Sequence, residues 1–110
     1  MGLFSFLFRK GDNSKLIEAL KSGAMLVDVR SPGEYSSGSI PGAINVPMET
    51  VRQHTAKFKG DKPVVVFCRS GLRSAAVKRI LVQQGITEVV DGGSLVNVQD
   101  VVDKIKGEGR

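Results

Sequence analysis

The only cysteine of this 110-residue chain, Cys68, begins the run Cys-Arg-Ser-Gly-Leu-Arg-Ser at residues 68–74. The run before it, residues 64–67, is apolar, β-branched and aromatic, which is typical of a short buried parallel strand. After the cysteine, from about Arg73 to Gln84, apolar and polar residues follow helical spacing. We therefore expect the thiol on a tight loop between a strand and a helix, where α/β sheets bind ligands and helix N-termini favour anions.

This position favours the reactive form of the sulfur. A free thiol is mostly protonated at neutral pH, and the thiolate is the nucleophile. A helix N-terminus contributes roughly 0.3–1 kcal/mol to holding a negative charge. Backbone N–H groups of residues 69–73 and the guanidinium groups of Arg69 and Arg73 would add to that. The pattern predicts a thiolate of lowered pKa without a partner histidine, and the alternative is an inert cysteine that fills core space.

Four blocks of the chain, in order, match the pattern of one family. They are Leu26–Arg30 with Glu34–Tyr35, Gly38–Pro47, Val65–Ser74 and Val90–Gly93. With these blocks the sequence resembles the rhodanese-like domain, of the single-domain sulfurtransferase kind. The resemblance implies an α/β fold with a central parallel β-sheet flanked by helices on both faces, a three-layer sandwich.

The resemblance also implies a reaction. Cys68 would take a sulfane sulfur from a small anionic donor such as thiosulfate, or from a persulfide donor, and become a persulfide held by loop amides. It would then pass the sulfur to a thiophilic acceptor, either cyanide or a thiol such as that of a thioredoxin. We predict no cofactor, and no cluster of Cys, His and carboxylates has the spacing of metal ligands.

The predicted site centres on the loop. Cys68 is the predicted catalytic residue. The predicted substrate-binding residues are Arg69, Ser70, Gly71, Leu72, Arg73, Ser74 and, from the end of the first predicted strand, Arg30. Arg30 could instead be structural, and an ion pair with Glu34 would order the loop that follows it. Asp28, among apolar residues, is expected to be structural and to bind backbone amides.

Two other functions remain as alternatives. Cysteine phosphatases use a related loop with the arginine six positions after the cysteine, whereas Arg73 is five positions after Cys68. This tighter loop suits a single sulfur atom better than phosphate, so phosphatase or arsenate reductase chemistry is the weaker alternative. Family members often carry a tryptophan soon after the glycine pair, but this chain has none and Ser-Leu-Val-Asn-Val occupies residues 94–98. A non-catalytic binding or regulatory module is therefore the other alternative.

Strands alternate with helices along the chain, which by itself predicts a parallel sheet. We divide the sequence into an apolar N-terminal segment, residues 1–10, and a single domain, residues 11–110. The predicted strands are Met25–Val29, Ala43–Val46, Val64–Phe67 and Thr87–Val90, and the predicted helices are about Ser14–Lys21, Glu34–Ser37, Glu49–Phe58, Arg73–Gln84 and Leu95–Ile105.

The N-terminal segment holds three of the five phenylalanines but is too short to cross a bilayer. We expect it to pack over the core, and the alternative is a peripheral membrane or partner contact through residues 1–8.

The composition of the chain limits its possible partners, disulfide bonds and cellular compartment. A net charge of +5 contributes to solubility and could attract anionic donors. No basic run is interleaved with aromatic residues, so the sequence does not indicate nucleic-acid binding. One cysteine permits no internal disulfide. A reactive thiol fits a reducing cytoplasm best, with the periplasm as the alternative.

Overall fold

The computed structural model describes residues 12–108 of the chain. Its centre is a parallel four-stranded sheet with the strand order β2-β1-β3-β4. The strands are β1 (Met25–Asp28), β2 (Ile44–Asn45), β3 (Val64–Cys68) and β4 (Val89–Ser94). Parallel neighbours cannot be joined by a tight hairpin, so a crossover segment must lie between them. The predicted parallel sheet is therefore confirmed.

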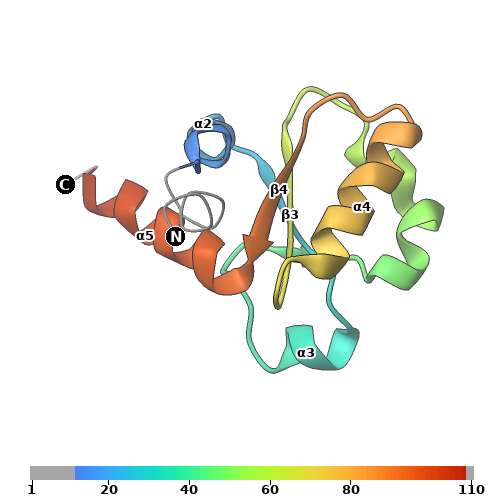
Figure 1. Cartoon of the computed structure of the whole chain (residues 1–110), viewed down its shortest axis with the longest axis horizontal. Helices are drawn as coiled ribbons and strands as arrows, with labels where there is room; N and C mark the ends of the chain where they lie inside the picture. Colours follow the sequence, from blue (N-terminus) through green and yellow to red (C-terminus); the bar gives the residue numbers. More distant parts are fainter. Residues whose placement is uncertain (1–11, 109–110) are drawn as a thin grey trace, which may run out of the picture.

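Helices cover both faces of the sheet, as the family resemblance implied. The helices are α2 (Ser14–Lys21), α3 (Pro32–Ser36), η1 (Met48–Phe58), α4 (Leu72–Gln83) and α5 (Leu95–Glu108). In Figure 1, α2 and α5 lie on one side of β3 and β4, and α4 lies on the other. The short helix α3 lies near the ends of β3 and β4 where the chain leaves the sheet.

The central strand β3 is buried along its whole length, which explains its nearly continuous apolar sequence. Because successive side chains of a strand point to opposite faces, β3 divides its residues between two cores. Val65 and Phe67 pack in the cluster that includes residues of α2 and α5. Val64, Val66 and Cys68 pack in the cluster that includes Val77 and Leu81 of α4. The cysteine side chain therefore faces the α4 side of the sheet.

Several element boundaries differ from those predicted. The last strand was expected at Thr87–Val90, but β4 continues to Ser94 and so includes the glycine pair. The pairing of β3 with β4 shifts register between Val66 and Phe67, because Gly92 is an extra residue on β4 at that step. The segment expected as an ordinary helix is the 3-10 helix η1, interrupted at His54, where φ is −117°.

The predicted N-terminal segment, residues 1–10, lies outside the described residues. Within residues 12–108, no helix has the length and apolar character needed to cross a bilayer.

Candidate active site

Cys68 is the last residue of β3, and its side chain is fully buried. Two backbone N–H groups converge on its sulfur: Gly71 N lies 3.0 Å from Sγ and Ser74 N lies 3.4 Å from it. Gly71 has φ of 99° and stands immediately before α4, so the chain reverses there in a conformation that favours glycine. This turn folds the loop around the Cys68 sulfur, and the first N–H groups of α4 face the sulfur.

These contacts decide the ionisation of the thiol. Burial raises the pKa of Cys68, but hydrogen bonds from the backbone and hydroxyl of Ser74 and from the N–H groups of Gly71 and Ser70 outweigh burial. The pKa of Cys68 is lowered as a result. A sulfur anion bound by backbone amides is the arrangement that the loop sequence predicted, and no histidine is among the groups that lower this pKa.

Ser74 joins the cysteine to a carboxylate that sequence reasoning did not place. Its buried Oγ lies 2.7 Å from Asp91 Oδ1 on β4, 3.1 Å from Gly71 O and 3.7 Å from Cys68 Sγ. Asp91 Oδ1 also accepts the N–H of Gly93 at 2.9 Å. The only signal for Asp91 in the sequence was its place in the block Val90–Gly93, and the parallel pairing of β3 with β4 brings that block to the loop.

Arg73 is held by Glu34 of α3 in a two-pronged ion pair. Its Nη1 and Nη2 donate to Glu34 Oε1 and Oε2 at 2.8 and 3.0 Å. Glu34 Oε1 also accepts the N–H of Ser31 and closes the capping box of α3. Hydrogen bonds from Arg73 and Ser31 lower the pKa of Glu34 to about 2. The guanidinium of Arg73 thus orders the loop and remains close enough to Cys68 to interact with its charge.

Arg30 pairs with Asp28, so the ion pair expected between Arg30 and Glu34 is wrong. Arg30 Nε and Nη2 lie 2.9 and 2.7 Å from Asp28 Oδ1 and Oδ2, and Nη2 also donates to Gly38 O at 2.7 Å. Asp28 also accepts the Arg30 N–H and the Ser39 hydroxyl. Both side chains are buried or nearly so, and a buried carboxylate requires such partners. Asp28 is therefore structural, whereas the part of Arg30 in substrate binding stays a prediction.

The rest of the predicted loop lies at the surface. Arg69 and Ser70 are exposed, and Leu72 is 81% exposed. The structure thus brings Cys68, Gly71 and Ser74 together around the sulfur, with an exposed rim beside them. Within residues 12–108, no group of three or more His, Cys, Asp or Glu side chains is arranged to hold a metal ion.

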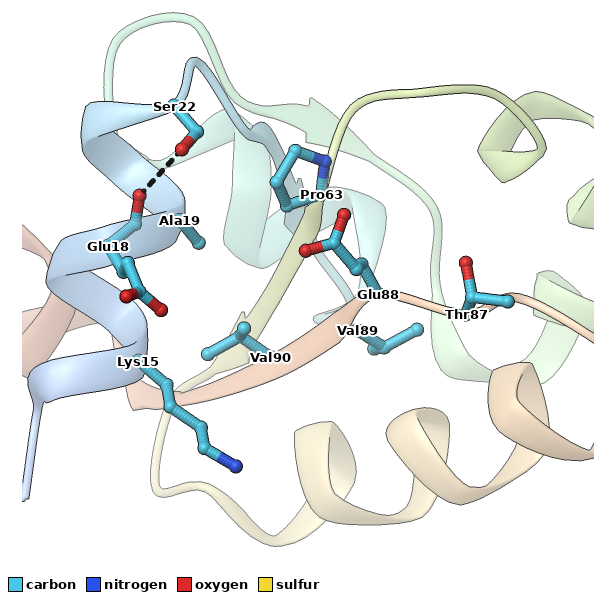
Figure 2. A pocket seen from close by; sticks show the side chains of 9 residues that line it. All are labelled: Lys15, Glu18, Ala19, Ser22, Pro63, Thr87, Glu88, Val89 and Val90. Atoms are coloured by element: carbon cyan, nitrogen blue, oxygen red, sulfur yellow. Dashed lines mark hydrogen bonds between the residues drawn. The ribbon is translucent and has the colours of Figure 1, made fainter.

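A separate hollow of about 390 Å³ lies between α2 and the start of β4. Figure 2 shows Lys15 and Glu18 on α2 facing Val89 and Val90, with Pro63 beside them. Pro63 precedes β3, whereas Cys68 ends it. The hollow therefore lies at the opposite end of the parallel sheet from the cysteine.

The chain belongs to the rhodanese-like domain family. The family model described as "Rhodanese-like domain" matches residues 12–95, which include all the residues around the sulfur described above.

Individual relatives agree with this assignment. The chain is 36% identical over 83 residues to "Thiosulfate sulfurtransferase PspE" of Escherichia coli, covering 74% of this chain and 78% of that protein. It is 38% identical over 66 residues to "Uncharacterized protein YqhL" of Bacillus subtilis, covering 60% of this chain but only 52% of that protein. The solved structure "rhodanese with anions from E. coli" superposes with a TM-score of 0.63 at 34% identity, over 68% of this chain and 91% of that one.

Proposed function

We propose that the protein is a rhodanese-type sulfurtransferase that carries a sulfane sulfur as a persulfide on Cys68. The donor is thiosulfate or a persulfide, and the acceptor is cyanide or a thiol. One observation carries the proposal: the buried Cys68 sulfur accepts the N–H groups of Gly71 and Ser74, and its pKa is lowered. Several homologues named for thiosulfate sulfurtransferase activity, such as PspE, support it.

The chemistry needs only the sulfur and its surroundings. The Cys68 thiolate attacks the outer sulfur of the donor, a bond from Sγ to that sulfur forms, and the donor's own sulfur–sulfur bond breaks. The electron pair leaves with the donor remnant, which is sulfite when thiosulfate is the donor. The acceptor then attacks the carried sulfur, and the electron pair of the breaking bond restores the thiolate. The two steps divide one transfer between a donor and an acceptor that need not meet.

Burial of the cysteine decides how the donor reaches it. Because Cys68 is fully buried, the loop around it must move before a donor sulfur can contact Sγ. The carried sulfur would then lie near the N-terminus of α4, where backbone amides and Arg73 favour an anion. A thioredoxin thiol is a proposed acceptor, and a reducing cytoplasm is the proposed compartment.

One observation favours a second candidate, a binding module without turnover. The same burial of Cys68 would fit a surface that docks a partner, as would Val96, which is 66% exposed in the stretch after the glycine pair where the family often carries a tryptophan. Phosphatase chemistry has less support, because Arg73 is bound to Glu34 by both of its terminal nitrogens.

The test is the intact mass of the purified protein before and after thiosulfate. We expect a gain of one sulfur atom that cyanide reverses, and no gain in Cys68→Ser. Because Ser preserves the shape of the side chain, the variant should fold like the wild type, which circular dichroism checks. No gain with thiosulfate or with a persulfide donor, in a protein whose thiol still reacts with iodoacetamide, would favour the binding module.

A further inference from the structure

The hydroxyl of Ser74 has more acceptors around it than it can serve. A serine hydroxyl holds one proton, and three acceptors surround Ser74 Oγ: Asp91 Oδ1 at 2.7 Å, Gly71 O at 3.1 Å and Gly93 O at 3.4 Å. The shortest contact is also the one to a carboxylate, and charge-assisted hydrogen bonds are the strongest. The proton therefore points to Asp91, and the oxygen lone pairs are left for the Cys68 thiol, whose sulfur lies 3.7 Å away.

While its proton points to Asp91, the Ser74 hydroxyl favours a neutral Cys68 thiol; it helps to lower the pKa of Cys68 only when the proton turns to the sulfur. A thiol can donate to the Ser74 oxygen, but a thiolate needs the Ser74 proton for itself. When Cys68 ionises, the hydroxyl must rotate away from Asp91 and donate to the sulfur. Asp91 and the Cys68 thiolate therefore compete for a single proton that lies between them.

We propose that Asp91 is a positioning residue that controls the ionisation of Cys68 through the Ser74 hydroxyl, which alternates between the carboxylate and the sulfur. The inference deepens the proposed function and rests on it for its role in turnover. In the free thiolate, Ser74 donates to Sγ. Once Sγ carries a second sulfur, the negative charge moves to the outer atom, and the hydroxyl returns to Asp91. The competition would thus disfavour the free thiolate relative to the persulfide.

Other charges near the loop must be considered in any test of pH dependence. Arg69 and Arg73 contribute positive charge from the loop and from α4, Glu34 of α3 neutralises Arg73, and Asp28 with Arg30 forms a closed pair at the end of β1. These groups act on the sulfur through space or through the backbone. Among these charged groups, only Asp91 accepts the proton of Ser74. Comparing Asp91 variants with and without the Ser74 hydroxyl therefore isolates the effect that runs through the hydroxyl.

The test is a double-mutant cycle on the thiolate titration, followed by ultraviolet absorbance and by the rate of alkylation against pH. Asp91→Asn keeps an oxygen for the Gly93 N–H but accepts the Ser74 proton more weakly. We expect a roughly three- to tenfold larger thiolate fraction below the midpoint of titration, because a neutral acceptor forms a weaker hydrogen bond than a carboxylate. When Ser74 is already replaced by Ala, Asp91→Asn should change the thiolate titration of Cys68 very little.

Each result supports or overturns the inference. An unchanged titration in Asp91→Asn overturns it, as does an equal shift with and without the hydroxyl, which would mean that the charge acts through space. Ser74→Ala alone must lower the thiolate fraction. Asp61→Asn, an exposed aspartate before β3, is the matched control and should titrate like the wild type. If Asp91→Asn does not fold, Asp91→Ala tests the same coupling by removing the acceptor. The titration uses no sulfur donor, so it can succeed even if persulfide formation fails.

Discussion

At the scale of single residues, Gly92 on β4 shows how closely the sheet and α5 approach each other beside the site. A Cβ atom placed there would lie 2.5 Å from Val98 Cγ2, 3.2 Å from Val65 Cγ1 and 3.3 Å from Val66 O. Gly92→Ala would therefore push α5 away from the sheet. We expect the free energy of unfolding to fall by about 1–3 kcal/mol, the usual cost of overpacking a core, as measured by urea denaturation.

Gly33→Ala is the matched control for this prediction. Gly33 lies on the exposed surface of α3, and a Cβ atom there would have no neighbour within 4 Å. Because alanine favours the helical conformation more than glycine does, Gly33→Ala should unfold at the same urea concentration as the wild type or at a slightly higher one. Equal stability of Gly92→Ala and the wild type would show that β4 and α5 can separate at no cost.

At the scale of elements, the ion pair of Glu34 and Arg73 connects α3 to α4 and so orders both sides of the loop. The pKa of Glu34 is lowered to about 2 from an ordinary value of 4.5. A carboxyl group whose pKa is lower in the folded state than in the unfolded state stabilises the fold when the pH is above the unfolded-state pKa. This stabilisation is lost as the pH falls through the folded-state pKa. Glu34→Gln should therefore lower the urea midpoint at about pH 7, and the difference from the wild type should shrink steadily below about pH 4.5.

Glu88→Gln provides the comparison for this pH series. Glu88 is an exposed carboxyl that immediately precedes β4, at the other end of the sheet, and its variant loses the same charge. Its urea midpoint should follow that of the wild type across the series. If the urea midpoint of Glu34→Gln is below that of the wild type by the same amount at about pH 7 and about pH 3, the ion pair does not contribute to stability.

At the scale of the whole molecule, the net charge of +5 should attract an anionic donor to the site. Arg69 is exposed on the loop and is not neutralised by Glu34, which binds Arg73. We expect the second-order rate of persulfide formation with thiosulfate to fall roughly two- to fivefold between about 20 mM and about 200 mM salt, because ions screen attraction beyond about a Debye length.

A neutral persulfide donor separates attraction from other effects of salt. Its rate should change little over the same range, since it has no charge to be screened. Equal salt dependence for the charged and the neutral donor would contradict electrostatic attraction. Arg69→Gln should reduce the salt dependence with thiosulfate, and Lys62→Gln, an exposed change before β3, should reduce it less.

Much of the site was determined by the sequence alone. The apolar run ending at Cys68, the glycine three residues later and the helical spacing that follows suffice to place a thiol at the start of a helix, because each feature is local. The parallel sheet also follows from the alternation of strands and helices. The position of Gly71, whose φ of 99° suits glycine, belongs to this local group.

The tertiary structure decided which charged groups meet. Arg30 pairs with Asp28 and Arg73 with Glu34, whereas the sequence analysis had paired Arg30 with Glu34. Asp91 reaches Ser74 only because β3 and β4 are neighbours in the sheet. The choice of an ion-pair partner depends on burial and on contacts between elements far apart in the chain, and the local pattern of residues does not contain that information.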